Sequence, residues 1–469
     1  MPHLGWVSLL ANTALTISMI TNRALPVLAN LCTLTDKYNR QYDKEFGQKG
    51  KKIGATCNVR VPPRYIGTFG PALNVEPSTE TYVPVPILYQ FHVDIQFNTI
   101  NMLLDIDDFE ERFIHPACLA VGNRVDSDGA YFGFQNTANR LGTPGTTPTA
   151  YKAFGDSRAM LVSEGMPKGM IPTAVLHPFA NSSMADALKG LFNPQARIDE
   201  IYETGMVAKK TAGADWFEDP NIANYSTGSF LGAPVLAGIT AAVGGTAILT
   251  AGWQQFGVIN LTGLTNSSAA CYVGDTIQIA GLFPVNPQSR GRYNSPSGLK
   301  QFVVLPPGGY AQMTGVATPG SPQFAPATLA AGTFNNTPGQ ATTGLYTASG
   351  TGTLSLTIAE CIITGGQFQN CSATAAFTGT PAVTLNAGAT LATNSTENLY
   401  FHRDAFALGV VDLPLPRNAT ASRAYDEDLG ISIRIVEDYT INNDAEPTRL
   451  DIAYGFASLY RSLAVRISG

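Results

Sequence analysis

The stretch from Leu104 to Phe134 has the most regular spacing of apolar and polar positions in the chain. Apolar residues recur there at steps of three and four, which places them on one face of a helix. These positions are Phe109, Phe113, Ala117, Ala120, Val121, Val125 and Phe132. Pro116 lies inside the pattern, so the helix is expected to kink there or to restart with Pro116 in its first turn. A helix of about 25 residues would be about 38 Å long, and the simplest interpretation is a helix of the core.

Two other element types are predicted just before this helix. The alternation from Leu88 to Asn98 predicts a strand, with Phe91, Val93, Ile95 and Phe97 on one face. The segment before it, up to Ile87, contains six prolines: Pro62, Pro63, Pro71, Pro77, Pro84 and Pro86. Because proline cannot donate to a strand ladder, we expect a projecting hairpin or loop rather than central strands.

Shorter elements follow the long helix. The run Pro148–Ser163 is expected to be a helix with Thr147 as its N-cap and Gly165 just past its end. Residues 171–176 predict a short buried strand, and residues 181–191 another helix.

The composition changes sharply between Ser229 and Ser395. The charged residues of this segment are Asp275, Arg290, Arg292, Lys300 and Glu360. Short alternating runs with turn residues between them predict an all-β barrel or sandwich. A disordered linker is the alternative, but such linkers are poor in β-branched residues. Charge returns after Asn398, where residues 431–435 and 449–454 predict a hairpin. Charge before and after the segment, with almost none within it, indicates an insertion into a discontinuous host domain.

Composition changes this picture in one respect. The 469 residues carry a formal net charge of −6, and only 14 % are charged, about half the usual share. The chain is long enough for about two to four domains, and its net charge does not indicate nucleic-acid binding. So little charge is unusual for a free monomer but fits a subunit that buries surface against copies of itself.

The apolar start, residues 4–31, lacks a basic signal-peptide region and is broken by polar residues, so we expect amphipathic helices and no membrane anchor.

The search for chemistry finds no catalytic constellation. The cysteines, Cys32, Cys57, Cys118, Cys271, Cys361 and Cys371, are scattered; free thiols are favoured, and a Cys361–Cys371 bridge is possible. Neither a zinc-type histidine spacing nor a phosphate-binding loop is present. The carboxylates at 105–111 could hold a cation, but favourable charge for a helix N-terminus is the simpler interpretation. We therefore expect no enzymatic activity and no cofactor.

Four stretches together carry a family resemblance: Asn58–Arg64, Ile106–Ala117, Phe401–Leu408 and Arg449–Gly455. In this order and spacing the chain, from about Asn30 to its end, resembles the major coat proteins of tailed bacteriophages, in the short-tailed enterobacterial (podovirus) branch.

The resemblance implies an α+β, Hong Kong 97-like coat fold with an inserted β-barrel. The implied parts are an N-terminal arm (1–43), an extended loop (44–87), a peripheral domain with the spine helix (88–165), an axial domain (166–228 and 396–430), the inserted domain (229–395) and closing strands of the peripheral domain (431–469).

The resemblance also implies partners and a location. Copies of the chain would form the hexamers and pentamers of an icosahedral shell enclosing double-stranded DNA, without sequence-specific binding. A scaffolding protein and a portal protein would take part, and assembly would occur in the host bacterial cytoplasm. A cellular nanocompartment shell of the same fold is the alternative function. A secreted β-rich adhesin, or an enzyme with a carbohydrate-binding insert, is a third, which the missing export signal and the missing carboxylate or nucleophile constellation disfavour.

The charged residues beside the extended loop give a candidate contact between subunits. We expect the loop to lie on a neighbouring copy, with its basic side chains facing acidic ones at the start of the spine helix. The basic residues are Lys49, Lys51, Lys52, Arg60 and Arg64, and the acidic ones are Asp105, Asp107 and Asp108. Exposed ion pairs contribute only about 0.2–1 kcal/mol each. This contact would therefore govern assembly only because it is repeated at every contact between subunits.

Overall fold

The computed structural model describes most of the chain. The described residues are 21, 24, 32–40, 56–76, 81–87, 89–98, 115–167, 169–188, 210–211, 213–266, 269–307, 333–335, 345–385, 393–417, 419–426, 431–439 and 445–468. The helices expected over 4–31 and the expected helix start over 104–114 lie outside these residues, apart from Thr21 and Ala24.

The long helix is present in the described residues as α4, which spans His115–Asn136. Pro116 lies in its first turn, where the missing amide hydrogen costs nothing. Of the expected face, Ala117, Val121, Val125 and Phe132 are buried, whereas Ala120 is exposed. This part of the predicted helix is confirmed.

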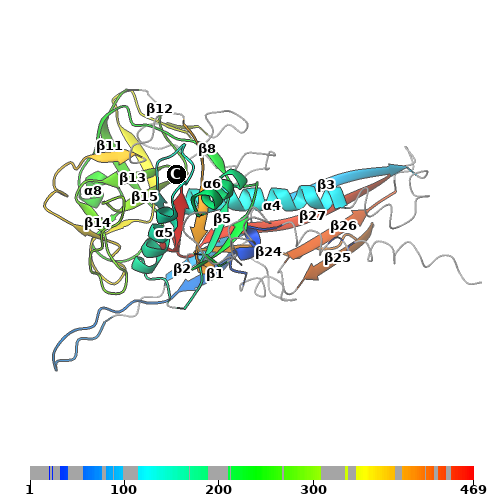
Figure 1. Cartoon of the computed structure of the whole chain (residues 1–469), viewed down its shortest axis with the longest axis horizontal. Coiled ribbons are helices and arrows are strands. Elements are labelled where there is room, and N and C mark those ends of the chain that lie inside the picture. Colours follow the sequence, from blue (N-terminus) through cyan, green and yellow to red (C-terminus); the bar gives the residue numbers. More distant parts are fainter. Residues whose placement is uncertain are drawn as a thin grey trace, which may run out of the picture.

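A five-stranded antiparallel sheet lies along α4 (Figure 1). Its strands are β3 (Tyr89–Asn98), β24 (Phe406–Val410), β25 (Thr420–Asp426), β26 (Ile431–Glu437) and β27 (Ala445–Ser458). The 14-residue β27 is central and pairs with β3, β24 and β26. The strand predicted at 88–98 and the pairing of 431–435 with 449–454 are both confirmed, and the connection between those two strands lies outside the described residues.

A second, mixed sheet has six strands. In spatial order they are β4 (Asn139–Leu141), β28 (Ala464–Ile467), β23 (Asn398–Phe401), β5 (Thr173–Leu176), β7 (Ala214–Glu218) and β6 (Lys210–Thr211). The predicted buried strand is β5, and the next helix, α6 (Pro178–Leu188), begins with proline three residues earlier than expected. Residues 396–430 supply β23 to this sheet and β24 and β25 to the five-stranded sheet. Residues 431–469 supply β28 to this sheet and β26 and β27 to the five-stranded sheet. Each of these two ranges is therefore divided between the two sheets.

The helix predicted over 148–163 is α5, which spans Tyr151–Ser163. The expected N-cap was wrong: Ala150, whose backbone is extended, holds that position, and residues 147–150 are not helical. The predicted end is right. Gly165 has φ +92°, and the amides of Gly165 and Met166 donate to Val162 and Leu161 at 3.1 and 3.0 Å, which is a Schellman motif.

The low-charge segment is rich in strands and has its own apolar core. Its main sheet has the order β21 (Val383–Leu385), β13 (Thr276–Ile279), β15 (Gln301–Leu305), β18 (Leu354–Ala359), β11 (Gly257–Leu264) and β9 (Gly232–Leu236). Smaller sheets are formed by β10 (Ile248–Leu249) with β19 (Ile362–Ile363), β14 (Leu282–Pro284) with β20 (Cys371–Ala373), and β12 (Ala269–Tyr272), β17 (Leu345–Thr347) and β16 (Thr333–Asn335). A four-residue helix, α8 (Ala241–Gly244), is the exception to the all-β expectation. Where the chain enters and leaves this segment, β8 (Asn224–Ser226) pairs with β22 (Asn394–Thr396).

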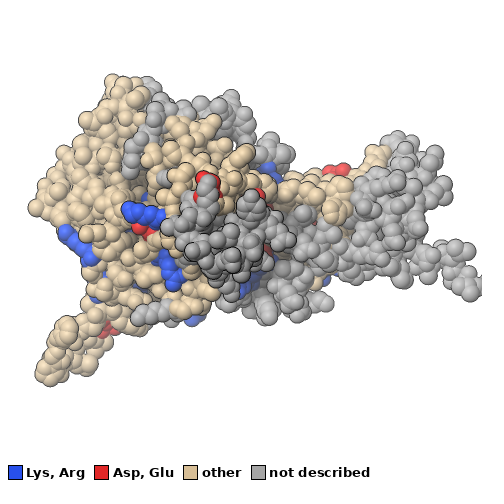
Figure 2. Space-filling view, in the orientation of Figure 1, with Lys and Arg blue, Asp and Glu red and all other residues tan. Residues whose placement is uncertain are grey.

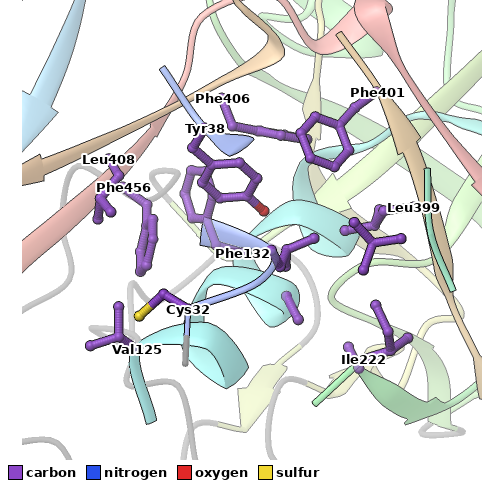
Figure 3. Packing of buried hydrophobic residues seen from close by; sticks show 14 of the residues in the cluster. Cys32, Tyr38, Val125, Phe132, Ile222, Leu399, Phe401, Phe406, Leu408 and Phe456 are labelled. Atoms are coloured by element: carbon purple, nitrogen blue, oxygen red, sulfur yellow. The ribbon is translucent and has the colours of Figure 1, made fainter. Parts of the chain in front are cut away.

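The main core joins residues 32–40 to α4 and to the two sheets described first, the five-stranded and the six-stranded one, which are called the host sheets below. Figure 3 shows Tyr38 of the arm among the rings of Phe401, Phe406 and Phe456. Its ring centroid lies 5.5, 5.1 and 6.2 Å from theirs. Such aromatic contacts fix the arm segment 32–40 against the body of the molecule.

Cys32, Cys118, Cys271, Cys361 and Cys371 are buried free thiols. Of the two states considered for Cys361 and Cys371, the structure therefore has the unbridged one. Among the described helices, none is long and apolar enough to cross a membrane.

Candidate functional site

A two-stranded hairpin projects from the body at the junction between the host sheets and the β-rich segment (Figure 1). Its strands are β1 (Thr56–Val61) and β2 (Thr81–Pro86), paired antiparallel. Pro84 and Pro86 are tolerated in β2 because it is an edge strand of a two-stranded sheet. The prediction of a projecting hairpin is confirmed.

The foot of the hairpin is held by an apolar cluster of its own. In both strands every second side chain faces the body of the molecule, and these side chains are four valines. The valines pack on β24, β27 and the residue just after β27. The cluster comprises Val59, Val61, Val83, Val85, Ala407, Ala457 and Leu459, all buried. The hairpin therefore leaves the body from a firmly packed base.

Beyond this foot, residues 62–76 form a projection without regular structure and with exposed apolar side chains. Phe69 is fully exposed, and Leu73 and Val75 are 90 % and 77 % exposed. Tyr65 and Ile66 are also at least half exposed. The run from 65 to 75 contains no charged residue, and Figure 2 shows a projection that is uncharged up to its base. No described residue of the same chain covers this apolar surface.

A carboxylate near the base ties the two limbs of the projection together. The amides of Ile66 and Gly67 donate to the two carboxylate oxygens of Glu76, each at 2.7 Å. Gly67 and Gly70 have φ of +68° and +115°, a region that favours glycine, so the chain can turn at these two positions. The projection therefore has a defined local conformation.

Arg60 and Arg64 are the members of the predicted charge contact that the structure describes. Arg60 is exposed on β1, and the guanidinium of Arg64 lies 5.8 Å from the centroid of the Phe368 ring. Arg64 also borders an open cavity of about 460 Å³, with Tyr65 and Glu164 among its lining residues. The other proposed contact residues, Lys49, Lys51, Lys52, Asp105, Asp107 and Asp108, lie outside the described residues, so the charge contact stays a prediction.

A buried ion pair joins the end of α5 to the β-rich segment beside this foot. Lys300 Nζ lies 2.8 Å from Glu164 Oε1, and both side chains are almost fully buried. The hydroxyl of Tyr293 donates to the same oxygen at 2.5 Å, and Asn286 Nδ2 donates to the carbonyl of Ser163 at 2.7 Å. Burial lowers the pKa of Lys300, but the nearby Glu164 and Glu360 carboxylates outweigh it, so the net pKa lies above its usual value.

A second buried network lies where β8 and β22 pair. Arg140 Nη2 contacts Glu397 Oε1 at 2.6 Å and donates to the hydroxyl of Tyr225. Arg466 Nη1 lies 3.8 Å from the other oxygen of Glu397, and Ser395 donates to Glu397 at 2.8 Å. Burial raises the pKa of Glu397, but Arg140 and Arg466 together hold it below its ordinary value.

Groups suited to chemistry are sparse. Within the described ranges, no set of three or more His, Cys, Asp or Glu side chains could hold a metal ion. His92 Nδ1 and Asp94 Oδ2 are 3.1 Å apart, but both side chains lie on the open face of β3 and are more than a third exposed. The most distinctive feature of the described residues is the exposed apolar projection. The charge-based reasoning missed it, although the uncharged run from 65 to 75 between prolines was a usable signal.

Comparison with known proteins gives matches among solved structures. No known protein-family model matches the chain, and no curated protein matches it. A structure of Mycobacterium phage Che8 has a TM-score of 0.37 and 10 % identity, over 93 % of this chain and 90 % of that chain. The capsid structure of the cyanophage P-SCSP1u has a TM-score of 0.38 and 8 % identity, over 88 % and 83 %. The mature capsid of bacteriophage PhiM1 has a TM-score of 0.34 and 7 % identity, over 92 % and 87 %. All three TM-scores lie below 0.5, so function is argued from the residues of this chain.

Proposed function

We propose that this chain is a major capsid protein, which assembles with copies of itself into the icosahedral shell around the double-stranded DNA of a tailed phage. The observation that carries the proposal is the apolar projection 65–75, which stands clear of the described body. An exposed apolar surface of this kind marks an interaction site. The low charge of the whole chain supports the same reading, because a free monomer would have little to keep it from associating.

The magnitudes favour the apolar projection over ion pairs as the main contact. Burying a large apolar side chain contributes about 1.5–3 kcal/mol, so Phe69, Leu73 and Val75 together would contribute roughly 5–9 kcal/mol. Each exposed ion pair of the predicted charge contact would add only about 0.2–1 kcal/mol. Association itself costs roughly 4–15 kcal/mol, so one such contact is marginal. In a closed shell each subunit both offers and receives a projection, and the contacts then support one another.

The remaining parts of the coat fold are proposals of the same kind. Residues 1–43 would be the arm, 44–87 the extended loop, 88–165 and 431–469 the peripheral domain, and 166–228 with 396–430 the axial domain. Residues 229–395 would be an inserted domain on the outer face, because DNA inside a shell favours surfaces rich in Lys and Arg. A scaffolding protein and a portal would be the assembly partners of the chain, and the role of the chain would be structural rather than catalytic.

The test compares two triple variants of the full chain. In the first, Phe69, Leu73 and Val75 of the projection are replaced by Ser; in the second, the control residues are Phe179, Leu415 and Val243, which have the same side-chain types and are exposed elsewhere. Each protein is produced in bacteria with and without the phage scaffolding protein and viewed by negative-stain microscopy. Circular dichroism checks that each variant is folded.

We expect closed shells from the parent and the control, and folded but unassembled subunits from the projection variant. A parent that forms no shells under any of these conditions would argue against a capsid role. Normal shells from the projection variant would show that the apolar projection is not the contact that holds the shell together.

A further inference from the structure

Residues 33–35 are held to α4 by hydrogen bonds to one buried carboxylate, beside the bond that the Tyr38 hydroxyl donates to the carbonyl of Gly129 at 2.8 Å. Asp126 of α4 accepts hydrogen bonds from the amides of Thr33, Leu34 and Thr35, at 2.8, 3.2 and 2.8 Å. It also accepts the hydroxyl of Thr35 at 2.7 Å. Hydrogen bonds to a charged acceptor are roughly twice as strong as neutral ones. The backbone of 33–35 is therefore held to the helix through one side chain.

A second carboxylate is buried at the same place. Asp219, immediately after β7, is only 1 % exposed and interacts with the Asp126 side chain. Its Oδ1 accepts the amide of Asn221 at 2.8 Å, whereas its Oδ2 receives no hydrogen bond within the described part of the chain. Two buried carboxylates cannot both be ionised at low cost, but a proton on Asp219 lets that oxygen donate to Asp126.

The electrostatics agree with this geometry. Burial, and then the negative charge of Asp126, raise the pKa of Asp219 to about 7. The arm side chains facing the pair do not titrate nearby, because burial and Asp126 raise the pKa of Cys32 to about 12 and that of Tyr38 well above its usual value.

Four described charged or polar residues near the pair contact one another in two pairs. On the arm, Arg40 and Asp36 carry opposite charges, and their nearest atoms are 3.5 Å apart. Asn123 of α4 accepts a hydrogen bond from Asn221 at 3.4 Å, and both are uncharged. Among these described groups, Asp219 is the one whose pKa lies near neutral pH.

We propose that a proton on Asp219, donated in a hydrogen bond to Asp126, is a latch: while it is bound, residues 33–35 stay docked on α4, and its loss promotes their release. The latch is independent of the assembly proposal, because it concerns contacts within one chain.

The sign of the pH effect follows from the two states of the arm. In the released state Asp219 is hydrated and its pKa returns toward the ordinary 3.8, so release gives up a proton. Release therefore becomes easier as the pH rises from about 4 to about 7, by up to roughly tenfold per pH unit, and levels off above about 7.

Hydrogen exchange of the full chain, measured by mass spectrometry between pH 5 and pH 9 and corrected for the intrinsic exchange rate, tests the latch. We expect the protection of the 33–35 amides to fall toward pH 7 and then to level off. Asp219→Asn, whose amide can always donate to Asp126, should keep the low-pH protection at every pH. Asp128→Asn is the matched control: Asp128 also lies on α4 and is half-buried, but its partners are Arg124 and Tyr454.

The control should retain the parent's pH profile. A parent profile without pH dependence would overturn the latch by itself, even if Asp219→Asn did not fold. An Asp219→Asn profile equal to the parent's, or a flat Asp128→Asn profile, would also overturn it, since the proton would then lie elsewhere.

Discussion

The buried Lys300–Glu164 pair gives the sharpest test of how the β-rich segment is held to the host sheets. Replacing Lys300 by Met removes the cation but keeps most of the apolar stem, so Glu164 is left buried with Tyr293 as its remaining donor. Two unit charges 2.8 Å apart attract by about 6 kcal/mol at an effective dielectric constant of about 20. Desolvation of the two ions costs several kcal/mol each, so the net contribution of the intact pair is about zero.

The single change is therefore expected to cost far more than the pair contributes. Leaving one charge buried without its partner typically destabilises by about 3–5 kcal/mol, so we expect Lys300→Met to lower the free energy of unfolding by that amount. The double variant Lys300→Met with Glu164→Leu removes both charges, and we expect it to be within about 1 kcal/mol of the parent or more stable.

Urea unfolding of the unassembled chain, followed by tryptophan fluorescence, measures these differences. Lys152→Met on α5 is the control, because its partner Asp156 is 3.7 Å away and Lys152 is 84 % exposed. We expect that control to cost less than about 0.5 kcal/mol. If Lys300→Met cost no more than the control, or the double variant cost as much as the single one, the reasoning from burial would be wrong.

Two further changes test the arm contact and the second buried network. A Cβ at Gly129 of α4 would lie 2.3 Å from Thr35 Cγ2, so Gly129→Ala should destabilise the chain by about 1–2 kcal/mol in urea unfolding despite its better helix propensity. Gly155→Ala on α5, where the new methyl group meets nothing within 4 Å, should instead stabilise it by roughly 0.5–1 kcal/mol. Because the pKa of Glu397 is lowered in the folded chain, its ionised carboxylate stabilises the folded state fully above about pH 4.5. This stabilisation is lost as the pH falls through the folded-state pKa. Urea unfolding at several pH values should show that Glu397→Gln abolishes this part of the acid sensitivity, and an unchanged acid profile would contradict the assignment.

Much of the fold could be predicted from local patterns. The alternation at 88–98 predicted β3, the three- and four-residue spacing predicted α4, and Gly165 correctly marked the end of α5. These three predictions were correct because strand periodicity, helix periodicity and the positive φ at the end of a helix all depend on residues that are close together in the sequence. The start of α5 was wrong for the complementary reason: the prolines and threonines at 143–150 fit several turn conformations, and the buried contacts of Phe154 decide where the helix begins.

The candidate site could be predicted only in part. The prolines between 62 and 86 predicted a projection, and the scarcity of charge predicted a surface that associates. Which side chains remain exposed on it, and that they are apolar rather than basic, depends on how the foot packs against strands more than 300 residues away in the chain.

The sequence by itself determined the helices, the strands, the projecting hairpin and the low-charge β-rich segment, because hydrophobic periodicity and proline act over a few residues. Only the tertiary structure decided that Lys300 would meet Glu164, that Glu397 would lie between Arg140 and Arg466, and that Asp219 would be buried beside Asp126. Those pairings join residues 69 or more positions apart. Their energies depend on burial and on the distance between charges, and neither exists until the chain has folded.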